Sequence, residues 1–237
     1  MTWHQVQRIA IAGGAMLADS VCIGNLDAAR AFEPEFWGAR GELDEVGRGR
    51  GSAWFIGPAA RQWVLRHYRR GGWVARFSTD RYAWAGEARV RAFAEWRLLA
   101  ALVERGLPVP MPIAARYVRT GMSYRCDLIT RRIQNAEPLS VRLKRTPLSD
   151  AQWQAVGETV RRLHAAGVYH ADLNAHNILI DGAGTVSVID FDRGSLRRPG
   201  AWAARNLSRL RRSLVKVSRD GFPAGSWRHL MAGYAAL

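Results

Sequence analysis

The sequence predicts an α+β fold with two lobes: a β-rich N-terminal lobe that contains one helix, and a short, mainly helical C-terminal lobe. Over the first 70 residues, short apolar segments bounded by glycine indicate strands. Around residues 86–105 the apolar residues take helical spacing, and they do so again after residue 149. We therefore expect the N-lobe at residues 1–130, a hinge at 131–138 and the C-lobe at 139–237.

The N-lobe begins with a predicted hairpin, VQRIAIAGGAMLAD, with a Gly13–Gly14 turn. Residues 46–57 follow as a glycine-rich loop that leads into an apolar run, and residues 61–72 as a strand. In that strand, alternation places Trp63, Leu65 and His67 on one face and Val64, Arg66 and Tyr68 on the other.

A helix is predicted over Gly86–Arg105, ended by Gly106 and a proline-rich segment. Two strands around Gly121 come next, then a polar link at residues 134–140. A second helix begins with Ser149 or Asp150 as N-cap and runs to His164. The C-lobe then contains a polar loop, a hairpin over residues 178–190 and a basic helical stretch.

The chain carries a formal net charge of +15, from 35 basic and 20 acidic residues, and its only lysines are Lys144 and Lys216. Such an excess indicates an anionic partner: nucleic acid, a phosphorylated substrate or an acidic membrane face. A genome rich in G and C accounts equally well for the preference for arginine. Two cysteines form no disulfide framework, and no segment resembles a signal peptide or a membrane span, so we expect a soluble or peripheral protein.

Residues 170–177 read HADLNAHN, which fits the pattern H-x-D-L-x-x-x-N, and V-I-D-F-D follows at residues 188–192. Asp190 comes 13 residues after Asn177, which is enough for a strand, a turn and a return strand. A hairpin of that length brings Asn177 and Asp190 side by side. Their amide and carboxylate oxygens, next to the carboxylate of Asp172, suit Mg²⁺ bound together with phosphate.

On these residues the chain resembles the protein-kinase-like fold. The resemblance implies that Asp172 is the catalytic base, that Asn177 and Asp190 hold Mg²⁺, and that ATP is the phosphoryl donor. His170 belongs to the same catalytic site, where it would pack the loop against the Asp190 turn. The glycine-rich loop would bind the ATP phosphates through backbone N–H groups; its residues are Gly47, Gly49, Gly51 and Ser52.

The chain departs from the kinase pattern at the strand lysine that pairs with a helix glutamate and the ATP phosphates. No lysine lies in that region, and Arg66 is the best substitute because it shares a strand face with Val64. Arginine binds phosphate through two N–H groups but is bulkier than lysine. We expect Glu95 as its partner, with Glu87 as a less central choice, and both Arg66 and Glu95 at the ATP site.

Only 45 residues follow Asp192, and no A-P-E sequence follows it, so the chain has little room to dock a polypeptide. Six stretches resemble the Kdo kinases (Kdo is 3-deoxy-D-manno-octulosonic acid) of the lipopolysaccharide core kinase family of Gram-negative bacteria. The stretches are Val64–Gly72, Arg89–Leu102, Gly106–Ala115, Leu128–Leu139, His170–Leu179 and Asn206–Lys216. The resemblance implies ATP-dependent phosphorylation of the 4-hydroxyl of Kdo on a lipid A precursor.

That substrate carries a carboxylate and lipid phosphates, and the resemblance places the enzyme peripherally on the cytoplasmic side of the inner membrane. Basic residues would approach such a surface electrostatically, at about 1 kcal/mol each. The candidate residues are Arg69, Arg70, Arg205, Arg209, Arg211, Arg212 and Lys216, and a solvated helix face is the simpler alternative.

Three other functions are compatible with parts of the sequence. A phosphotransferase of the same fold could act on another sugar or on an aminoglycoside, but aminoglycosides are cations and the chain is basic. A nucleic-acid-binding module is allowed by charge, yet no known motif supports it and no nucleic acid is expected as a partner. A degenerate ATP-binding regulator is disfavoured because Asp172, Asn177 and Asp190 are all retained.

Overall fold

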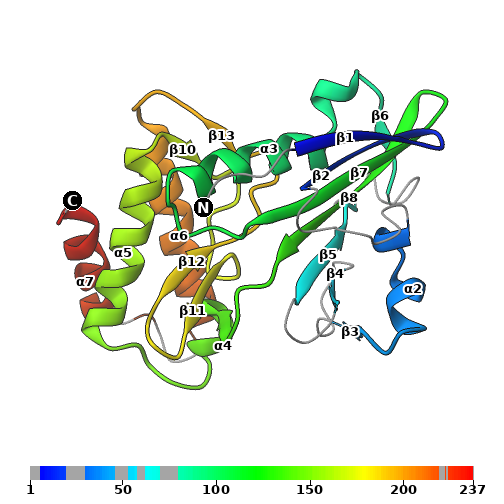
Figure 1. Cartoon of the computed structure of the whole chain (residues 1–237). Helices are drawn as coiled ribbons and strands as arrows, with labels where there is room; N and C mark the ends of the chain where they lie inside the picture. The colour runs from blue at the N-terminus through cyan, green and yellow to red at the C-terminus, as the bar shows by residue number, and fades with distance from the viewer. Residues whose placement is uncertain are drawn as a thin grey trace. The chain divides into compact units, whose positions relative to one another are not determined.

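The computed structural model describes residues 6–19, 30–45, 53–57, 62–69, 80–218, 222 and 224–236 (Figure 1). The chain divides into two compact units: residues 1–100 with 111–132, and residues 101–110 with 133–237. The first is built on an antiparallel sheet, and the second is mainly helical. The predicted α+β class, with a β-rich N-terminal part and a helical C-terminal part, is confirmed.

The first unit contains an antiparallel sheet in which eight strands are described. Seven of them follow the order β1-β2-β7-β8-β5-β4-β3, and the short β6 pairs with β8. Their bounds are β1 Val6–Ile11, β2 Gly14–Asp19, β3 Leu43–Glu45, β4 Ala53–Ile56, β5 Trp63–His67, β6 Tyr82–Ala83, β7 Pro112–Thr120 and β8 Ser123–Arg131. The two strands predicted around Gly121 are therefore confirmed as β7 and β8.

The predicted N-terminal hairpin is confirmed, but its turn lies one residue earlier than expected. Ile11 pairs with Gly14, so Ala12 and Gly13 form the turn, and Gly13 has a φ of 73°. Gly14 is instead a strand residue, and a Cβ there would come 1.9 Å from the carbonyl oxygen of Tyr117 on the neighbouring β7. The second glycine thus permits close strand approach rather than the turn.

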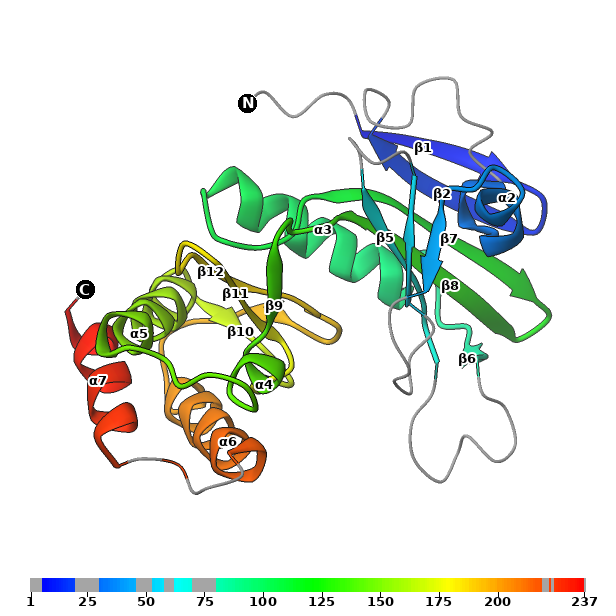
Figure 2. The same ribbon diagram turned by 90° about the horizontal axis from the view of Figure 1, so that it is seen from below.

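Helices cover both faces of this sheet (Figure 2). On one face, η1 (Arg30–Phe32) and α2 (Pro34–Gly38) bury Phe32 and Trp37 against Trp63 and Leu65 of β5. On the other face, α3 (Arg91–Glu104) packs Phe93 on the ring of Tyr117, with ring centroids 5.3 Å apart. The predicted alternation of side chains along β5 is confirmed, because Arg66 and Tyr68 reach α3 instead.

Helix α3 begins at Arg91, five residues later than predicted. Gly86 has a φ of 93°, residues 87–89 form the 3₁₀ turn η4 (Glu87–Arg89), and Val90 is extended with a ψ of 123°. The helical periodicity continued through Val90 only because its buried side chain packs in line with those of the helix. The end of the helix is as expected, with Gly106 at a φ of 64°.

The second unit is built around α5 (Asp150–Ala165), which packs against α7 (Ala224–Ala235). Ser149 and Gln152 form a capping box, so the predicted N-cap is confirmed as Ser149. The other elements are α4 Leu139–Arg142, α6 Trp202–Val217, a three-stranded sheet and a two-stranded sheet. The sheet strands are β9 Ala136–Pro138, β10 Val168–Tyr169, β11 Ile178–Asp181, β12 Val186–Val188 and β13 Ser195–Leu196.

The polar link predicted at residues 134–140 is more ordered than expected. Its middle forms β9, in which Pro138 pairs with Leu179 and Ala136 with Asp181 of β11. Pairing is possible despite Pro138 because proline is tolerated at a sheet edge, and β9 is the outer strand of the order β12-β11-β9.

Candidate active site

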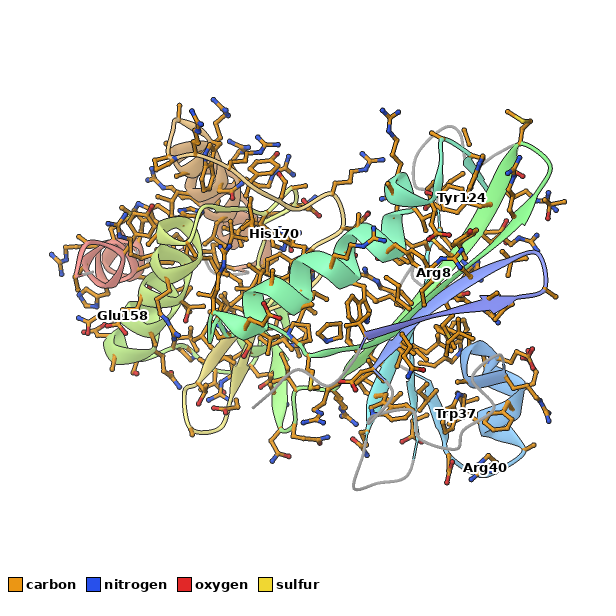
Figure 3. All side chains as sticks on the ribbon, turned by 45° about the horizontal axis from the view of Figure 1, so that its top comes forward. Arg8, Trp37, Arg40, Tyr124, Glu158 and His170 are labelled. Carbon is orange, nitrogen blue, oxygen red and sulfur yellow. The ribbon has the colours of Figure 1, made fainter. Side chains whose placement is uncertain are left out.

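His170 lies at the start of the polar loop between β10 and β11 and is only 2% exposed (Figure 3). Its Nδ1 accepts a hydrogen bond from the backbone N–H of Asp172 at 3.1 Å, so its Nε2 carries the proton and donates to the Ile189 carbonyl at 3.0 Å. Burial lowers the pKa of His170 and keeps the ring neutral. Both ring nitrogens are therefore engaged with backbone, which fits a positioning role rather than proton transfer.

The β11–β12 ladder sets the position of Asn177 relative to the turn that carries Asp190. Ile178 pairs with Val188, and one step further the N–H of Ile189 donates to the Asn177 carbonyl at 2.9 Å. Asn177 is thus aligned with the residue that precedes Asp190. Asp190 itself has a φ of 64°, a left-handed conformation that aspartate tolerates better than most residues.

The side chain of Asn177 also fixes the loop that carries Asp172. Its Nδ2 donates to the Asp172 backbone carbonyl at 3.0 Å, and the residue is 9% exposed. This contact defines the orientation of the amide, with the nitrogen toward the loop. The amide oxygen is then the atom that could bind a cation.

The carboxylate of Asp172 is 58% exposed and accepts hydrogen bonds on both oxygens. Oδ1 accepts from Nη1 of Arg209 at 2.9 Å, and Oδ2 accepts from Nδ2 of Asn174 at 3.0 Å. Because the group is held by two donors yet remains accessible, an acceptor hydroxyl could approach it without prior rearrangement of the loop.

Helix α6 holds the loop through side chains that sequence reasoning missed. Asn206 hydrogen-bonds both backbone groups of His170, and the hydroxyl of Ser213 accepts from the Ala175 N–H at 3.1 Å. Together with Arg209, these residues lie on one helix face at spacings of three and four. The sequence contains one indication of this role. Asn206 is a polar residue four positions before Leu210, on the helix face that Leu210 and Leu214 bury.

The donor set at Asn177 and Asp190 fits Mg²⁺, because the ion prefers hard carboxylate and amide oxygens. In the described part of the chain, no group of three or more His, Cys, Asp or Glu residues could hold a metal ion. A protein site with one or two carboxylates is the usual arrangement when Mg²⁺ takes its other ligands from nucleotide phosphates and water.

In the first unit, Arg66 and Glu95 form the ion pair expected from the sequence. Nη2 of Arg66 donates both to a carboxylate oxygen of Glu95 and to the hydroxyl of Tyr68, the latter at 2.9 Å. The Tyr68 hydroxyl in turn donates to the same oxygen of Glu95, whose side chain is 2% exposed. Burial raises the pKa of Tyr68, which keeps this donor protonated.

Glu87, the second choice as partner of Arg66, is engaged elsewhere. It forms two hydrogen bonds of 2.8 Å with Arg8 of β1 and accepts a third from the Tyr117 hydroxyl. The hydrogen bonds from Arg8 contribute most to lowering the pKa of Glu87 to about 2. Glu87 therefore holds the N-terminal hairpin through Arg8, and of the two predicted partners Glu95 is the one that pairs with Arg66.

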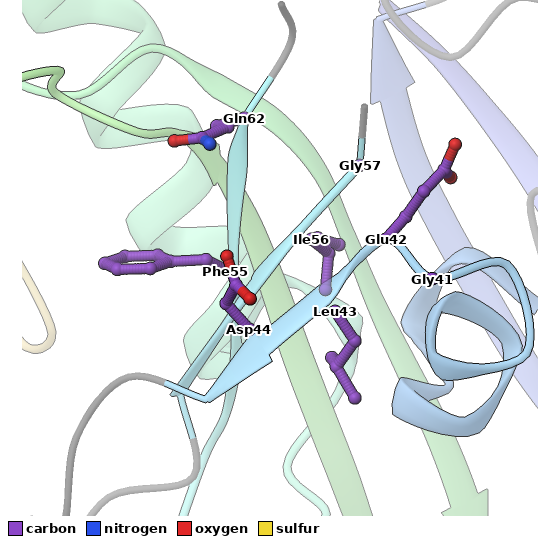
Figure 4. A pocket seen from close by; sticks show the side chains of 8 residues that line it. All are labelled: Gly41, Glu42, Leu43, Asp44, Phe55, Ile56, Gly57 and Gln62. Carbon is purple, nitrogen blue, oxygen red and sulfur yellow. The ribbon is translucent and has the colours of Figure 1, made fainter. Parts of the chain in front are cut away.

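The four glycine-loop residues of the ATP-site prediction, Gly47, Gly49, Gly51 and Ser52, lie outside the described residues. The strands on either side of that loop, β3 and β4, are paired through Leu43–Ile56 and Asp44–Phe55. A pocket of about 140 Å³ lies at the other end of these strands (Figure 4). Its lining includes Glu42 and Asp44, so the pocket is unsuited to phosphate, and it contains no predicted site residue.

Comparison with known proteins identifies the family. The sequence model of the Lipopolysaccharide kinase (Kdo/WaaP) family matches residues 34–234. Proteins named 3-deoxy-D-manno-octulosonic acid kinase from Xanthomonas axonopodis pv. citri (strain 306) and Xanthomonas euvesicatoria pv. vesicatoria (strain 85-10) are each 47% identical to this chain, and one from Xylella fastidiosa (strain 9a5c) is 44% identical. Each alignment spans 205 residues, 86% of this chain and 81% of the relative. The predicted family is confirmed: the chain belongs to the Lipopolysaccharide kinase (Kdo/WaaP) family.

Proposed function

We propose that the protein transfers the γ-phosphoryl group of ATP to the 4-hydroxyl of Kdo on a lipid A precursor. The observation that carries the proposal is the joined arrangement of the Asp172 loop and the Asn177–Ile189 ladder. This arrangement supports the proposal because phosphoryl transfer needs a base and metal ligands held on one framework, the roles proposed here for Asp172, Asn177 and Asp190. The names of the relatives supply the acceptor sugar.

In this mechanism Asp172 orients the acceptor hydroxyl and takes its proton. The acceptor oxygen forms a bond to the γ-phosphorus as the bond from that phosphorus to the bridging oxygen of ADP breaks, and the proton on Asp172 is then released to solvent. His170 and Asn206 keep the loop backbone in place, so the carboxylate need not reorganise as the hydroxyl approaches.

Asn177 and Asp190 are proposed to hold Mg²⁺, which would neutralise charge on the ATP phosphates when bound. Arg66 is proposed to bind the ATP phosphates, with Glu95 and Tyr68 holding its guanidinium in place. The glycine-rich loop at residues 47–52 is proposed to complete the nucleotide site through its backbone N–H groups.

We also propose peripheral binding at the cytoplasmic face of the inner membrane. In the described residues, no helix is both long and apolar enough to cross a bilayer. Helix α6 carries exposed basic residues, which an anionic glycolipid surface would attract. They are Arg205, Arg209, Arg211, Arg212 and Lys216.

The test is transfer of label from γ-labelled ATP to a Kdo-bearing lipid A precursor in the presence of Mg²⁺. Removing the base in Asp172→Asn should lower kcat by about 10²- to 10⁴-fold, and chelation of the metal should abolish transfer. Glu158→Gln, an exposed acid-to-amide change on α5, is the matched control and should keep full activity. If the protein binds ATP but transfers no label to Kdo, Kdo is not the acceptor. If Asp172→Asn transfers label at the wild-type rate, Asp172 is not the catalytic base.

A further inference from the structure

Arg209 stands apart from the other basic residues of α6 because it touches the catalytic loop. Its Nη1 donates to Oδ1 of Asp172 at 2.9 Å, while the side chain stays 48% exposed. Within the described part of the chain, this is the only hydrogen bond of its guanidinium. A guanidinium has five N–H donors, so most of the fork remains available to a ligand beside Asp172.

The neighbours of Arg209 show that this contact is specific to one position. Arg205, Arg212 and Lys216 lie on the same helix face at spacings of four, three and four, and all are exposed. Among the described residues, none of the three forms a hydrogen bond or an ion pair with the loop. These four residues therefore form a row of positive charge along α6. Of the four, only Arg209 hydrogen-bonds to Asp172, beside which the acceptor hydroxyl must bind.

The acceptor proposed above places an anion near this point. In Kdo the carboxylate is on C2 and the acceptor hydroxyl on C4, with a single ring carbon between them. A hydroxyl that hydrogen-bonds to Asp172 lies within a few ångströms of the Arg209 guanidinium, which already bonds to the same carboxylate. The sugar carboxylate is thus brought within reach of the free part of the fork.

A contact between Arg209 and the sugar carboxylate would offset the repulsion between that carboxylate and Asp172. A sugar acid that approaches Asp172 meets a like charge, which would weaken binding unless a cation lay between the two carboxylates. Arg209 can bind both at once: one N–H on Asp172 and a planar pair of N–H groups on the sugar carboxylate.

On this basis, and resting on the proposed function, we propose that Arg209 forms a carboxylate subsite that selects an acidic sugar as the acceptor. Arg209 would touch substrate directly, while its bond to Asp172 sets the distance between the subsite and the base. The ligand class is a sugar acid with its carboxylate two carbons from the hydroxyl that is phosphorylated.

The experiment compares two acceptors and four proteins. The acceptors are the Kdo-bearing lipid A precursor and the same molecule with the Kdo carboxylate converted to its methyl ester. The proteins are wild type, Arg209→Gln, Arg209→Lys and the control Arg228→Gln, which removes the same charge from an exposed position on α7. Thermal unfolding establishes that each variant is folded, and kcat and KM are measured for each acceptor.

Wild type and Arg228→Gln should prefer the acid over the ester by about 10- to 100-fold in kcat/KM, the range for a charge-assisted hydrogen-bonded pair. Arg209→Gln should lose most of this preference, chiefly through a higher KM for the acid. Arg209→Lys should keep part of it, because it keeps the charge but not the planar fork.

Two results would overturn the inference in distinguishable ways. If wild type phosphorylates the acid and Arg209→Gln slows both acceptors equally, with the preference intact, Arg209 only positions Asp172. If wild type phosphorylates neither acceptor, the proposed function itself fails and the subsite fails with it.

Discussion

The side chain of Asn206 binds both backbone groups of His170. Its Oδ1 accepts from the His170 N–H at 3.3 Å, and its Nδ2 donates to the His170 carbonyl at 2.8 Å. Asn206 is 3% exposed, so water cannot replace these bonds. Helix α6 thereby fixes the first residue of a loop that lies 36 positions earlier in the chain.

Asn206→Ala should therefore destabilise the fold and slow phosphoryl transfer. Two buried backbone groups of His170 would lose their partners, at about 1–3 kcal/mol for each unsatisfied group. We expect a loss of about 3 kcal/mol in the free energy of unfolding and a lower kcat, measured by urea unfolding and transfer to Kdo. Ser208→Ala, at an exposed position on the same helix, should change neither, and an unchanged kcat in folded Asn206→Ala would contradict this role of α6.

Arg66→Ala should weaken ATP binding and also destabilise the fold. The change removes Arg66 from the ion pair with the buried carboxylate of Glu95, and the loss of one partner of a buried pair costs about 3 kcal/mol. We expect the KM for ATP to rise at least about tenfold if Arg66 binds phosphate through a charge-assisted contact. Fluorescence titration with ATP and kinetics measure this effect.

Arg116→Ala is a matched control for Arg66. Arg116 lies in the same sheet and pairs at 2.7 Å with Asp127, another buried carboxylate. The Arg116→Ala variant should lose about as much stability as Arg66→Ala, but its KM for ATP should not change. An equal rise in KM in both variants would attribute the effect of Arg66→Ala to general loosening of the sheet.

The parts of the site that were predictable rest on local geometry. The separation of 13 residues between Asn177 and Asp190 fits a strand, a turn and a return strand. The pairing of Arg66 with Glu95 was instead predicted from the resemblance to kinases, with strand alternation placing Arg66 on the same face as Val64. The contacts of Asn206 and Ser213 depend on how α6 docks on residues 36 to 38 positions away. No periodicity in either segment encodes that docking.

The differences between the predicted and the observed fold also have specific causes. Glycine can allow a turn or a close strand approach, and the sequence does not distinguish Gly13 from Gly14 in these roles. The start of α3 was misplaced because Val90 is buried in phase with the helix although its backbone is extended. Strand β9 was missed because its three residues form a strand only through pairing with β11.

His164 should make the second unit sensitive to mild acid. Burial lowers its pKa to about 4, while its hydrogen bond with Asn206 acts in the opposite direction. An unfolded histidine titrates near 6.5, so between pH 6.5 and 4 the unfolded chain binds the extra proton. The contribution to stability is present above pH 6.5 and is lost as the pH falls to about 4, with a total on the order of 3 kcal/mol.

His164→Gln tests this pH dependence by comparison with wild type. The free energy of unfolding of both proteins is measured with urea from pH 7.5 to 4. As the pH falls, the stability of wild type should decrease relative to that of the variant. Loss of the 2.9 Å hydrogen bond to Tyr234 would instead lower the stability of the variant at every pH. A difference that stays constant across this range would show that His164 is not held neutral.

Gly157→Ala should destabilise the contact between α5 and α7, although alanine favours helix by about 1 kcal/mol over glycine. A Cβ at Gly157 would lie 1.9 Å from the Leu230 carbonyl oxygen and 2.7 Å from the Tyr234 nitrogen, both backbone atoms. Helix α7 would have to move away, and we expect a net loss of about 2–3 kcal/mol in urea unfolding. Gly225→Ala in α7 meets no atom within 4 Å and should stabilise the protein by up to about 1 kcal/mol. The two substitutions are the same chemical change within helices, so their opposite signs would isolate the close approach at Gly157, and a stabilising Gly157→Ala would contradict it.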